Sequence, residues 1–324
     1  MVKKYFGYIF LLISLGVLAS VAQARSPQLP WQPLPVNAWV VYQPQTRDMT
    51  LSETKWHHIF KQLQQQGAKG IVFQWSAFGS AHFNQALPET PNLNGVNLER
   101  LFDLAAQRGL KIKIGLYSDP AFFHHIKQSH DQLDDYLAEL QRHSLQQAMR
   151  WQPIWQNPAF AGWYIPEEID DYHWQNPQQQ AILIKHLQEF IGKLKQLTPE
   201  HETYLSVYIG GHQHPTQTTD FFKQIVAQTK VNLWLQDGMG TQALSQVQRQ
   251  SYFNALLSCN KPSNIGLIYE VFRQQSGPDE TFSASYIEPE QWQQQLKQEQ
   301  IYCSTENIVF SLRYLPLAKG YLQL

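Results

Sequence analysis

Residues 38–75 have the sequence AWVVYQPQTRDMTLSETKWHHIFKQLQQQGAKGIVFQW. The stretch begins with an apolar run at 38–43 and ends with a second one at 70–75. Between them, Thr50-Leu51-Ser52-Glu53 has the form of a capping box, and apolar side chains follow at helical spacing, at Trp56, Ile59, Phe60 and Leu63. A strand, a helix and a second strand in this order are the repeating unit of α/β folds.

The same alternation continues to the end of the chain. We predict eight strands from short runs rich in β-branched and aromatic residues, at 38–43, 70–75, 111–117, 162–165, 204–209, 232–236, 266–272 and 308–313. Helical patterns separate them: Asn97 and Asn176-Pro177 mark two helix starts, and Leu244, Val247 and Leu256 mark the sixth helix. This order predicts an α/β protein, a single (β/α)8 TIM barrel over residues 37–324.

A doubly wound parallel sheet is the alternative fold. That fold usually carries a glycine-rich phosphate loop after its first strand, whereas the segment here, Tyr42-Gln43-Pro44-Gln45, contains no glycine. The sequence therefore favours the barrel.

The composition excludes several classes of function. Charged residues make up 16% of the chain and the formal net charge is -1, so no basic surface for nucleic acid or anionic lipid is expected. Hydrophobic residues reach 43% and aromatic residues 13%, which excludes extended disorder. Glutamine supplies much of the polarity. We expect a globular monomer that handles a neutral, hydrogen-bonding ligand.

The N-terminus has the features of an export signal. Lys3 and Lys4 precede an apolar run, and Ala22-Gln23-Ala24 follows it, as in a secretory signal peptide cleaved after Ala24. We therefore divide the chain into a signal peptide (1–24), a Pro-rich lead-in (25–36) and the barrel (37–324). The alternative is an uncleaved anchor. Cleavage predicts a periplasmic or extracellular protein without a stable membrane anchor.

Export makes a disulfide bond possible. Cys259 and Cys303 are the two cysteines of the chain, and each lies a few residues before a predicted strand. If those strands are neighbours, the two thiols lie at the same end of the sheet. A bridge is one outcome and a pair of inert thiols is the other.

Polar and aromatic side chains occupy nearly every predicted strand end, which is where TIM barrels bind ligands. Amide, phenol, indole and carboxyl groups can bind hydroxyls or stack on sugar rings. The candidate substrate-binding residues are Gln43, Gln74, Trp75, Tyr117, Trp163, Trp174, Tyr208, Gln236, Asp237 and Arg313. Asp237, which precedes Gly238, is either a sugar ligand or a turn residue. Trp75, Trp163 and Trp174 are either core residues or platforms for sugar rings, and their positions favour platforms.

Two glutamates define the predicted chemistry. Glu168 follows the fourth strand and Glu270 follows Gly-Leu-Ile-Tyr in the seventh. Glycoside hydrolysis needs two carboxyl groups, one to protonate the leaving oxygen and one to attack the anomeric carbon or activate water. We predict Glu168 as the acid/base and Glu270 as the nucleophile, with Glu167 as the alternative acid. The competing interpretation is that these carboxylates cap helices or pair with arginine.

Other candidates are weaker. We interpret Asp119 as a turn or cap residue and expect Asp170 and Asp171 to shape the loop after the fourth strand. His212 and His214 form an H-x-H pair without a third ligand at fixed spacing, so we predict no metal site and no cofactor.

Two segments carry a family resemblance. The opening strands with Gln74-Trp75, and the segment Gly162-Trp163-Tyr164-Ile165-Pro166-Glu167-Glu168, resemble a bacterial family of uncharacterised proteins, domain of unknown function 4434. The resemblance covers roughly 37–315 and implies a barrel related to glycoside hydrolases. Carboxylates after strands four and seven also resemble the large clan of retaining (β/α)8 glycoside hydrolases, in which an Asn commonly precedes the acid/base; here Glu167 holds that place.

The resulting hypothesis is an exported, retaining glycoside hydrolase-like enzyme that cleaves a polysaccharide or oligosaccharide. The alternative is a non-catalytic saccharide-binding barrel that serves exopolysaccharide or envelope glycan handling. A third hypothesis is metal-dependent hydrolysis or deacetylation with His212, His214 and an Asp.

Overall fold

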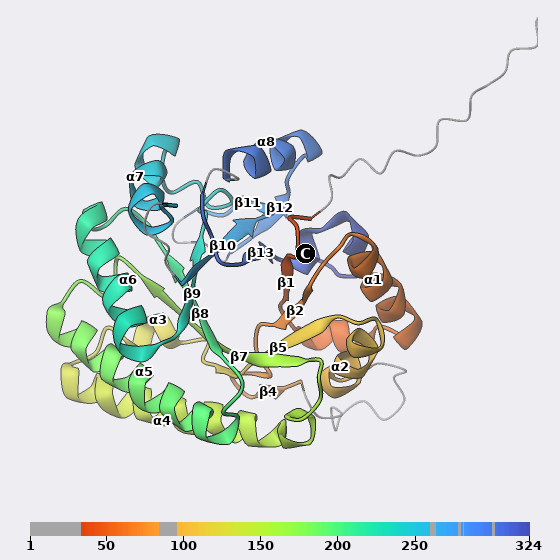
Figure 1. The fold of residues 1–324 in the computed structure, drawn as a ribbon, viewed down its shortest axis with the longest axis horizontal. Coiled ribbons are helices and arrows are strands. Elements are labelled where there is room, and N and C mark those ends of the chain that lie inside the picture. Colours follow the sequence, from red (N-terminus) through yellow and green to blue (C-terminus); the bar gives the residue numbers. More distant parts are fainter. Residues whose placement is uncertain (1–33, 84–95, 260–263, 278–279, 281, 300–301) are drawn as a thin grey trace, which may run out of the picture. The chain divides into compact units, whose positions relative to one another are not determined.

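A closed barrel of eight parallel strands forms the centre of the structure (Figure 1). The computed structural model describes residues 34–83, 96–259, 264–277, 280, 282–299 and 302–324. The barrel strands are β1 (Trp39–Tyr42), β2 (Gly70–Phe73), β5 (Lys111–Gly115), β7 (Phe160–Asp170), β8 (Thr203–Tyr208), β9 (Asn232–Gln236), β10 (Ile265–Glu270) and β13 (Asn307–Phe310). Each overlaps one predicted strand, so the TIM-barrel prediction is confirmed. The predicted signal peptide and most of the lead-in lie outside the described residues.

Helices surround the barrel (Figure 1). The longer ones are α1 (Glu53–Gln65), α2 (Leu98–Gln107), α4 (His130–Arg150), α5 (Pro177–Leu197), α6 (Pro215–Thr229), α7 (Gln246–Leu256) and α8 (Pro289–Glu299). Short elements fill the connections: α3 (Phe122–His125), the 3-10 helices η1 (Thr46–Thr50) and η2 (Gln152–Ile154), and the strands β3 (Ala77–Phe78), β4 (Ala81–His82), β6 (Tyr117–Ser118), β11 (Phe272–Gln274) and β12 (Ala284–Tyr286). After β13, the 3-10 helices η3 (Leu312–Tyr314) and η4 (Pro316–Ala318) stand where an eighth α-helix would be expected.

Local signals explain most helix starts. The side chain of Asn97 accepts a hydrogen bond from the Arg100 amide, and Asn176 caps α5 with Pro177 at its first position. The predicted capping box at Thr50 is wrong, because Ser52 is the N-cap of α1 and the Thr50 hydroxyl donates instead to the Arg47 carbonyl at 2.8 Å.

The predicted apolar face of α7 is wrong at two of its three residues. Leu244 lies before its N-cap, Ser245, and Val247 is 74% exposed. Leu256 is buried as predicted, together with Arg249, Tyr252 and Phe253, so the helix turns a different side to the barrel than Val247 suggested.

The barrel interior is filled by side chains. Its apolar cluster contains Trp39, Val41, Val72, Tyr164, Trp234, Ile268 and Ile308, while a larger cluster lies between the strands and the helices. Towards the N-terminal ends of the strands, the Lys113 ammonium bonds both carboxyl oxygens of Glu306 at 2.8 and 2.9 Å and lies 3.4 Å from the Tyr204 ring centroid. Burial lowers the pKa of Lys113 to about 7. The barrel is therefore a packed core with an ion pair in its floor.

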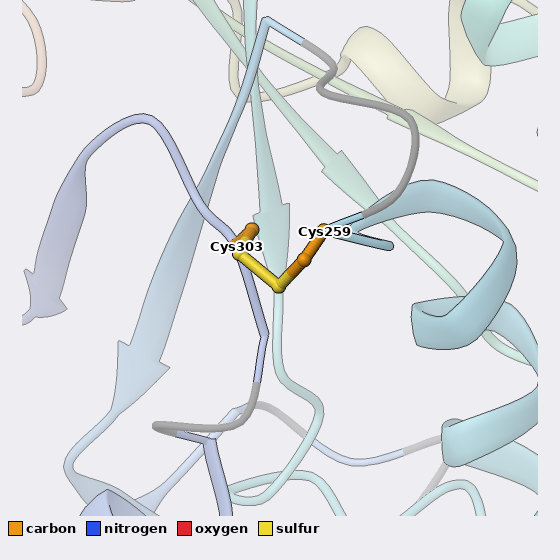
Figure 2. The surroundings of a disulfide bond; sticks show 2 residues. All are labelled: Cys259 and Cys303. Atoms are coloured by element: carbon orange, nitrogen blue, oxygen red, sulfur yellow. A yellow bond between two sulfur atoms is a disulfide. The ribbon is translucent and has the colours of Figure 1, made fainter.

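A disulfide bond joins Cys259 and Cys303, whose Cα atoms are 5.0 Å apart (Figure 2). Cys259 follows α7 and Cys303 precedes β13. β10 and β13 are paired neighbours, so both cysteines lie in connections that enter the barrel from the N-terminal ends of the strands. The bridge is therefore on the floor side, away from the strand ends that were predicted to bind ligand.

Candidate functional site

Because side chains alternate along each strand, some inward-facing positions at the C-terminal ends of the strands hold polar residues. Trp234 and Ile268 face the interior, and because side chains alternate along a strand, Gln236 and Glu270 continue the same inward rows. The C-terminal ends of β9 and β10 therefore present an amide and a carboxyl group to the mouth of the barrel.

Glu270 is more deeply buried than Gln236. Its side chain has no solvent exposure, and Oε2 accepts hydrogen bonds from the amides of Gly240 at 2.8 Å and Thr241 at 3.3 Å. Oε1 has no hydrogen-bond partner in the described part of the chain. Burial, and then the neighbouring Asp237 carboxyl, raise the pKa of Glu270 to about 8.

Asp237 is a turn residue behind Glu270 and does not face the mouth. It is 1% exposed. Its Oδ1 accepts hydrogen bonds from the amides of Met239 at 3.0 Å and Glu270 at 3.2 Å, and its Oδ2 accepts one from Gln295. The sugar-ligand alternative for Asp237 is therefore wrong, since no carboxyl oxygen is left open to a ligand.

Glu168 reaches the mouth from β7. The pairing of β7 with β8 shifts between Ile165 and Ile169, and this bulge carries the segment that contains Glu168. The half-buried carboxyl accepts a hydrogen bond from the Gln236 amide. Burial raises the pKa of Glu168 to about 7.

Glu168 lies close enough to Glu270 for its charge to affect the ionisation of Glu270. The Glu168 charge contributes to the raised pKa of Glu270. Both carboxylates also act on Tyr208, whose pKa rises to about 12 mainly through burial. The Tyr208 hydroxyl lies 3.1 Å from the Thr241 hydroxyl. The Tyr208 side chain therefore lies between Glu168 on β7 and the loop that holds Glu270.

Glu167 interacts with a different carboxyl group, that of Asp119. Glu167 is 8% exposed, and its Oε1 has no partner among the described residues. Burial raises its pKa to about 8, with a further contribution from Asp119. Asp119 in turn bonds the Tyr136 hydroxyl at 2.7 Å and His125 at 2.9 Å. Of the two adjacent glutamates, Glu168 is the one whose charge acts on Glu270.

Several predicted ligand residues remain partly open. Gln43, Gln74, Trp75, Tyr117, Tyr208 and Gln236 are all half-buried at strand ends. The Trp75 indole donates to the Pro44 carbonyl at 2.9 Å, and the Tyr117 ring stacks on His143 with centroids 4.8 Å apart. Gln74 keeps a buried carbonyl oxygen without a partner in the described residues. These side chains can offer amide, phenol and ring contacts to a saccharide.

Besides Asp237, three further predicted ligand residues are wrong. Trp163 is fully buried, and its indole donates to the Thr198 hydroxyl at 2.8 Å, on the side of the sheet that faces the helices. Trp174 is 1% exposed in the same outer cluster. Arg313 is 3% exposed and forms a two-pronged ion pair with Asp48, so its guanidinium is structural.

The loops above the barrel are held by carboxylates. Asp171 accepts hydrogen bonds from the amides of Gly210, Gly211 and His212 at 2.7–2.9 Å. Asp170 accepts bonds from the amide and ring of His173. His214 caps α6 by accepting from the Thr216 amide. Within the described residues, no cluster of three or more His, Cys, Asp or Glu side chains is arranged to hold a metal ion.

Sequence reasoning missed the groups that position Glu270. The amides of Gly240 and Thr241 come from the turn that begins at Asp237, and the Asp237-Gly238 pair signalled that turn without its role. Gln295 lies on α8, 25 residues after Glu270, and bonds both Asp237 and the Glu270 carbonyl. No local sequence signal indicates this contact.

Comparison with solved structures shows the fold family. A crystal structure described as "a putative alpha-L-fucosidase" from Bacteroides thetaiotaomicron matches with a TM-score of 0.63 and 14% identity, over 90% of this chain and 92% of that chain. The xylanase XynB from Paenibacillus barcinonensis matches with a TM-score of 0.50 and 11% identity over 91% of each chain. At such identities the likeness concerns the fold alone, which is the TIM barrel of these glycoside hydrolases.

Sequence comparison gives the family. The chain is 34% identical over 287 residues to "Uncharacterized protein YbcH" of Escherichia coli (strain K12), covering 88% of this chain and 92% of that protein. None of the helices that the structure describes is long and apolar enough to cross a membrane. Residues 39–318 match the family described as "Domain of unknown function (DUF4434)", and the chain belongs to that family.

Proposed function

We propose that the protein is an exported glycoside hydrolase-like enzyme that cleaves a saccharide with Glu168 and Glu270. One observation carries this proposal: two carboxyl groups from β7 and β10 interact at the mouth of the barrel, and burial raises the pKa of both towards neutrality. Two titratable groups perturbed in this way at a strand end are typical of acid–base sites.

The contacts of the two carboxyls assign their roles. Glu270 has Oε2 fixed by two backbone amides, so Oε1 is the oxygen that would attack the anomeric carbon. As that bond forms and the glycosidic C–O bond breaks, the leaving oxygen takes the proton of Glu168. Glu168 then removes a proton from water, which attacks the anomeric carbon and releases Glu270.

The pKa values of the free protein are in the reverse order to this division, because the single proton of the pair lies mainly on Glu270, so saccharide binding has to shift that proton to Glu168. With pKa values of about 7 for Glu168 and about 8 for Glu270, the interacting pair carries one proton between those values. Glu168 is the more exposed of the two, so it can exchange its proton with solvent during the second step. Tyr208 and Gln236, which lie beside the pair, would bind hydroxyl groups of the sugar, while Trp75 and Tyr117 would contact its rings.

A second candidate function is non-catalytic saccharide binding in exopolysaccharide or envelope glycan handling. The complete burial of Glu270 favours it, because the nucleophile must touch the anomeric carbon. Under the enzymatic proposal, saccharide binding therefore has to open access to Oε1.

Export is part of the proposal. The signal peptide predicted from the sequence supports it, and the disulfide between Cys259 and Cys303 is compatible with an oxidising compartment. The proposed location is periplasmic or extracellular, and the proposed form is a monomer without a cofactor.

The test is a digest of a polysaccharide panel with mass spectrometry of the products. Wild-type protein, Glu168→Gln and Glu270→Gln are compared, with Glu167→Gln as the control from the adjacent position. We expect turnover by the wild type and by Glu167→Gln, and a loss of at least 1,000-fold in the other two, of the order seen when a central catalytic group is removed. Saccharide binding without turnover by any form would favour the second candidate.

A further inference from the structure

A cavity of about 700 Å³ lies at the rim of the barrel, outside the site of Glu168 and Glu270. Its walls come from the connection between β1 and α1, from β12 and from the last residues of the sequence. The first of these connections leaves the C-terminal end of β1, so the cavity opens on the same face of the barrel as the two glutamates. No residue that lines this cavity takes part in the proposed hydrolysis.

The charges around this cavity are mainly positive. Arg47 and Lys55 line it and are both exposed. Lys319 lies close by, with its ammonium 5.2 Å from the centroid of the Tyr286 ring in the wall. Lys55 has no acidic partner among the described residues.

Asp48, the acidic side chain among the described residues of the wall, is already neutralised. Asp48 is 1% exposed. Its carboxylate forms two contacts with the Arg313 guanidinium, at 2.5 and 3.3 Å, and accepts the Tyr42 hydroxyl at 3.2 Å. Asp48 therefore does not cancel the positive charge that Arg47 and Lys55 present to the cavity.

Two tyrosines add apolar surface to the same walls. Tyr286 and Tyr321 are half-buried and both line the cavity. A phenol ring offers an apolar face for a sugar ring and a hydroxyl for hydrogen bonding. Cations together with tyrosine rings suit a ligand that has both an anionic group and a sugar ring.

The cavity is linked to the mouth of the barrel by Arg313. Its guanidinium holds Asp48 in the cavity wall and also donates to the Gln43 carbonyl at 3.2 Å. Gln43 follows the last residue of β1 and is one of the half-open residues at the mouth. A saccharide that extends from the mouth over β1 would therefore reach Arg47 and Lys55.

We propose that this cavity is a subsite for the acidic group of a glycan, a carboxylate or a sulfate, and that the protein acts on an acidic saccharide. This inference rests on the proposed function for the saccharide itself, and it adds the substrate class. It revises the neutral ligand that the composition suggested, because the local charge at the rim is positive although the net charge of the chain is close to zero.

The test compares pairs of probes that differ in charge. Oligogalacturonate is titrated against its methyl ester, and a sulfated carrageenan oligosaccharide against a neutral agarose oligosaccharide, by calorimetry with the full disulfide-bonded protein. The variants are Lys55→Gln, Arg47→Gln and their combination. Lys61→Gln is the control, because Lys61 is an exposed lysine of the same helix that does not line the cavity.

The wild type is expected to bind at least one acidic probe more tightly than its neutral counterpart, and this preference should weaken with added salt. Each single substitution is expected to reduce affinity for that acidic probe by about three- to fivefold, the range of an exposed ion pair. Lys61→Gln and the neutral probes should show no change. The arm that responds identifies the carboxylate or the sulfate.

Equal affinity for both members of each pair, an unchanged preference in the double variant, or no binding of any acidic probe would overturn the subsite. The binding readout separates this result from failure of the proposed chemistry. If Glu168→Gln abolishes turnover while the double variant keeps the wild-type charge preference, only the subsite fails. If no probe is cleaved but the preference depends on Lys55, the subsite stands and hydrolysis fails.

Discussion

Replacing Glu270 by glutamine should make the fold more stable at alkaline pH. The amide can still accept hydrogen bonds from the amides of Gly240 and Thr241 through its oxygen, but it carries no ionisable group in a site without solvent exposure. The ionised carboxylate of the wild type is expensive there, because burial and the Asp237 carboxyl both disfavour its charge.

The magnitude follows from proton linkage. The folded-state pKa of Glu270 is about 8, against an ordinary value of 4.5, so between these values the folded protein binds more protons than the unfolded chain. Stability of the wild type therefore falls as pH rises from 4.5 to 8. At about 1.4 kcal/mol per pKa unit, the contribution of Glu270 differs by about 4 kcal/mol between pH 5 and pH 9. Water that enters the site on ionisation would reduce this value, so it is an upper limit.

The assay is urea denaturation of the wild type and Glu270→Gln at pH 5 and pH 9, with the disulfide intact. The stability of the variant relative to the wild type should be higher at pH 9 than at pH 5 by about 1–4 kcal/mol. Taking this difference between the two pH values removes the effect of the amide on packing. Glu200→Gln, at an exposed position, is the control and should show no such change. An equal effect of Glu270→Gln at both pH values, or a larger stabilisation at pH 5, would refute the reasoning.

Three further predictions concern the mouth, the wall and the floor of the barrel. If the saccharide is cleaved, kcat/KM should rise through about pH 7 and fall above about pH 8, because the pair of Glu168 and Glu270 must hold one proton; a rate that is flat from pH 5 to 9 would contradict this. Trp163→Ala should lower the free energy of unfolding by about 3–5 kcal/mol without lowering saccharide affinity per folded molecule. Trp75→Ala should instead lower saccharide affinity and leave the free energy of unfolding nearly unchanged, and chemical denaturation and calorimetry measure the two quantities. Changing both Cys259 and Cys303 to serine should cost about 4 kcal/mol, since their bridge closes a loop with a sequence separation of 44 residues; an unchanged urea midpoint in the absence of reductant would contradict this.

The barrel could be predicted from sequence because each strand is a separate local signal. Apolar runs of four to seven residues alternated with helical patterns, and most helix starts carried a cap such as Asn97 or Asn176. The predicted ends of β7 and β10 also placed Glu168 and Glu270 on the correct face. Strand order did not have to be known, because all eight strands of a barrel end at the same face.

The remaining site residues depend on register and on distant partners. Trp163 and Tyr164 are adjacent, yet Trp163 faces the helices and Tyr164 faces the barrel interior, and composition alone could not tell which way each would point. Arg313 is not free to bind a ligand because its guanidinium pairs with Asp48, 265 residues earlier in the chain. Such contacts are created by the closure of the barrel, which brings β1 beside β13, and they leave no local pattern in the sequence.

The two ends of the barrel treat buried charge in opposite ways. At the floor, the Lys113 ammonium is matched by Glu306 and surrounded by the rings of Trp39, Tyr204 and Trp234. At the mouth, Glu167, Glu168 and Glu270 have no lysine or arginine partner within the described residues, and burial raises the pKa of all three. Unpaired buried carboxyls reduce stability, whereas apolar side chains at the same positions would fill the barrel at no such cost. A barrel that served only as a scaffold would gain nothing from this arrangement, so the imbalance supports the proposal that the protein acts at the C-terminal ends of its strands.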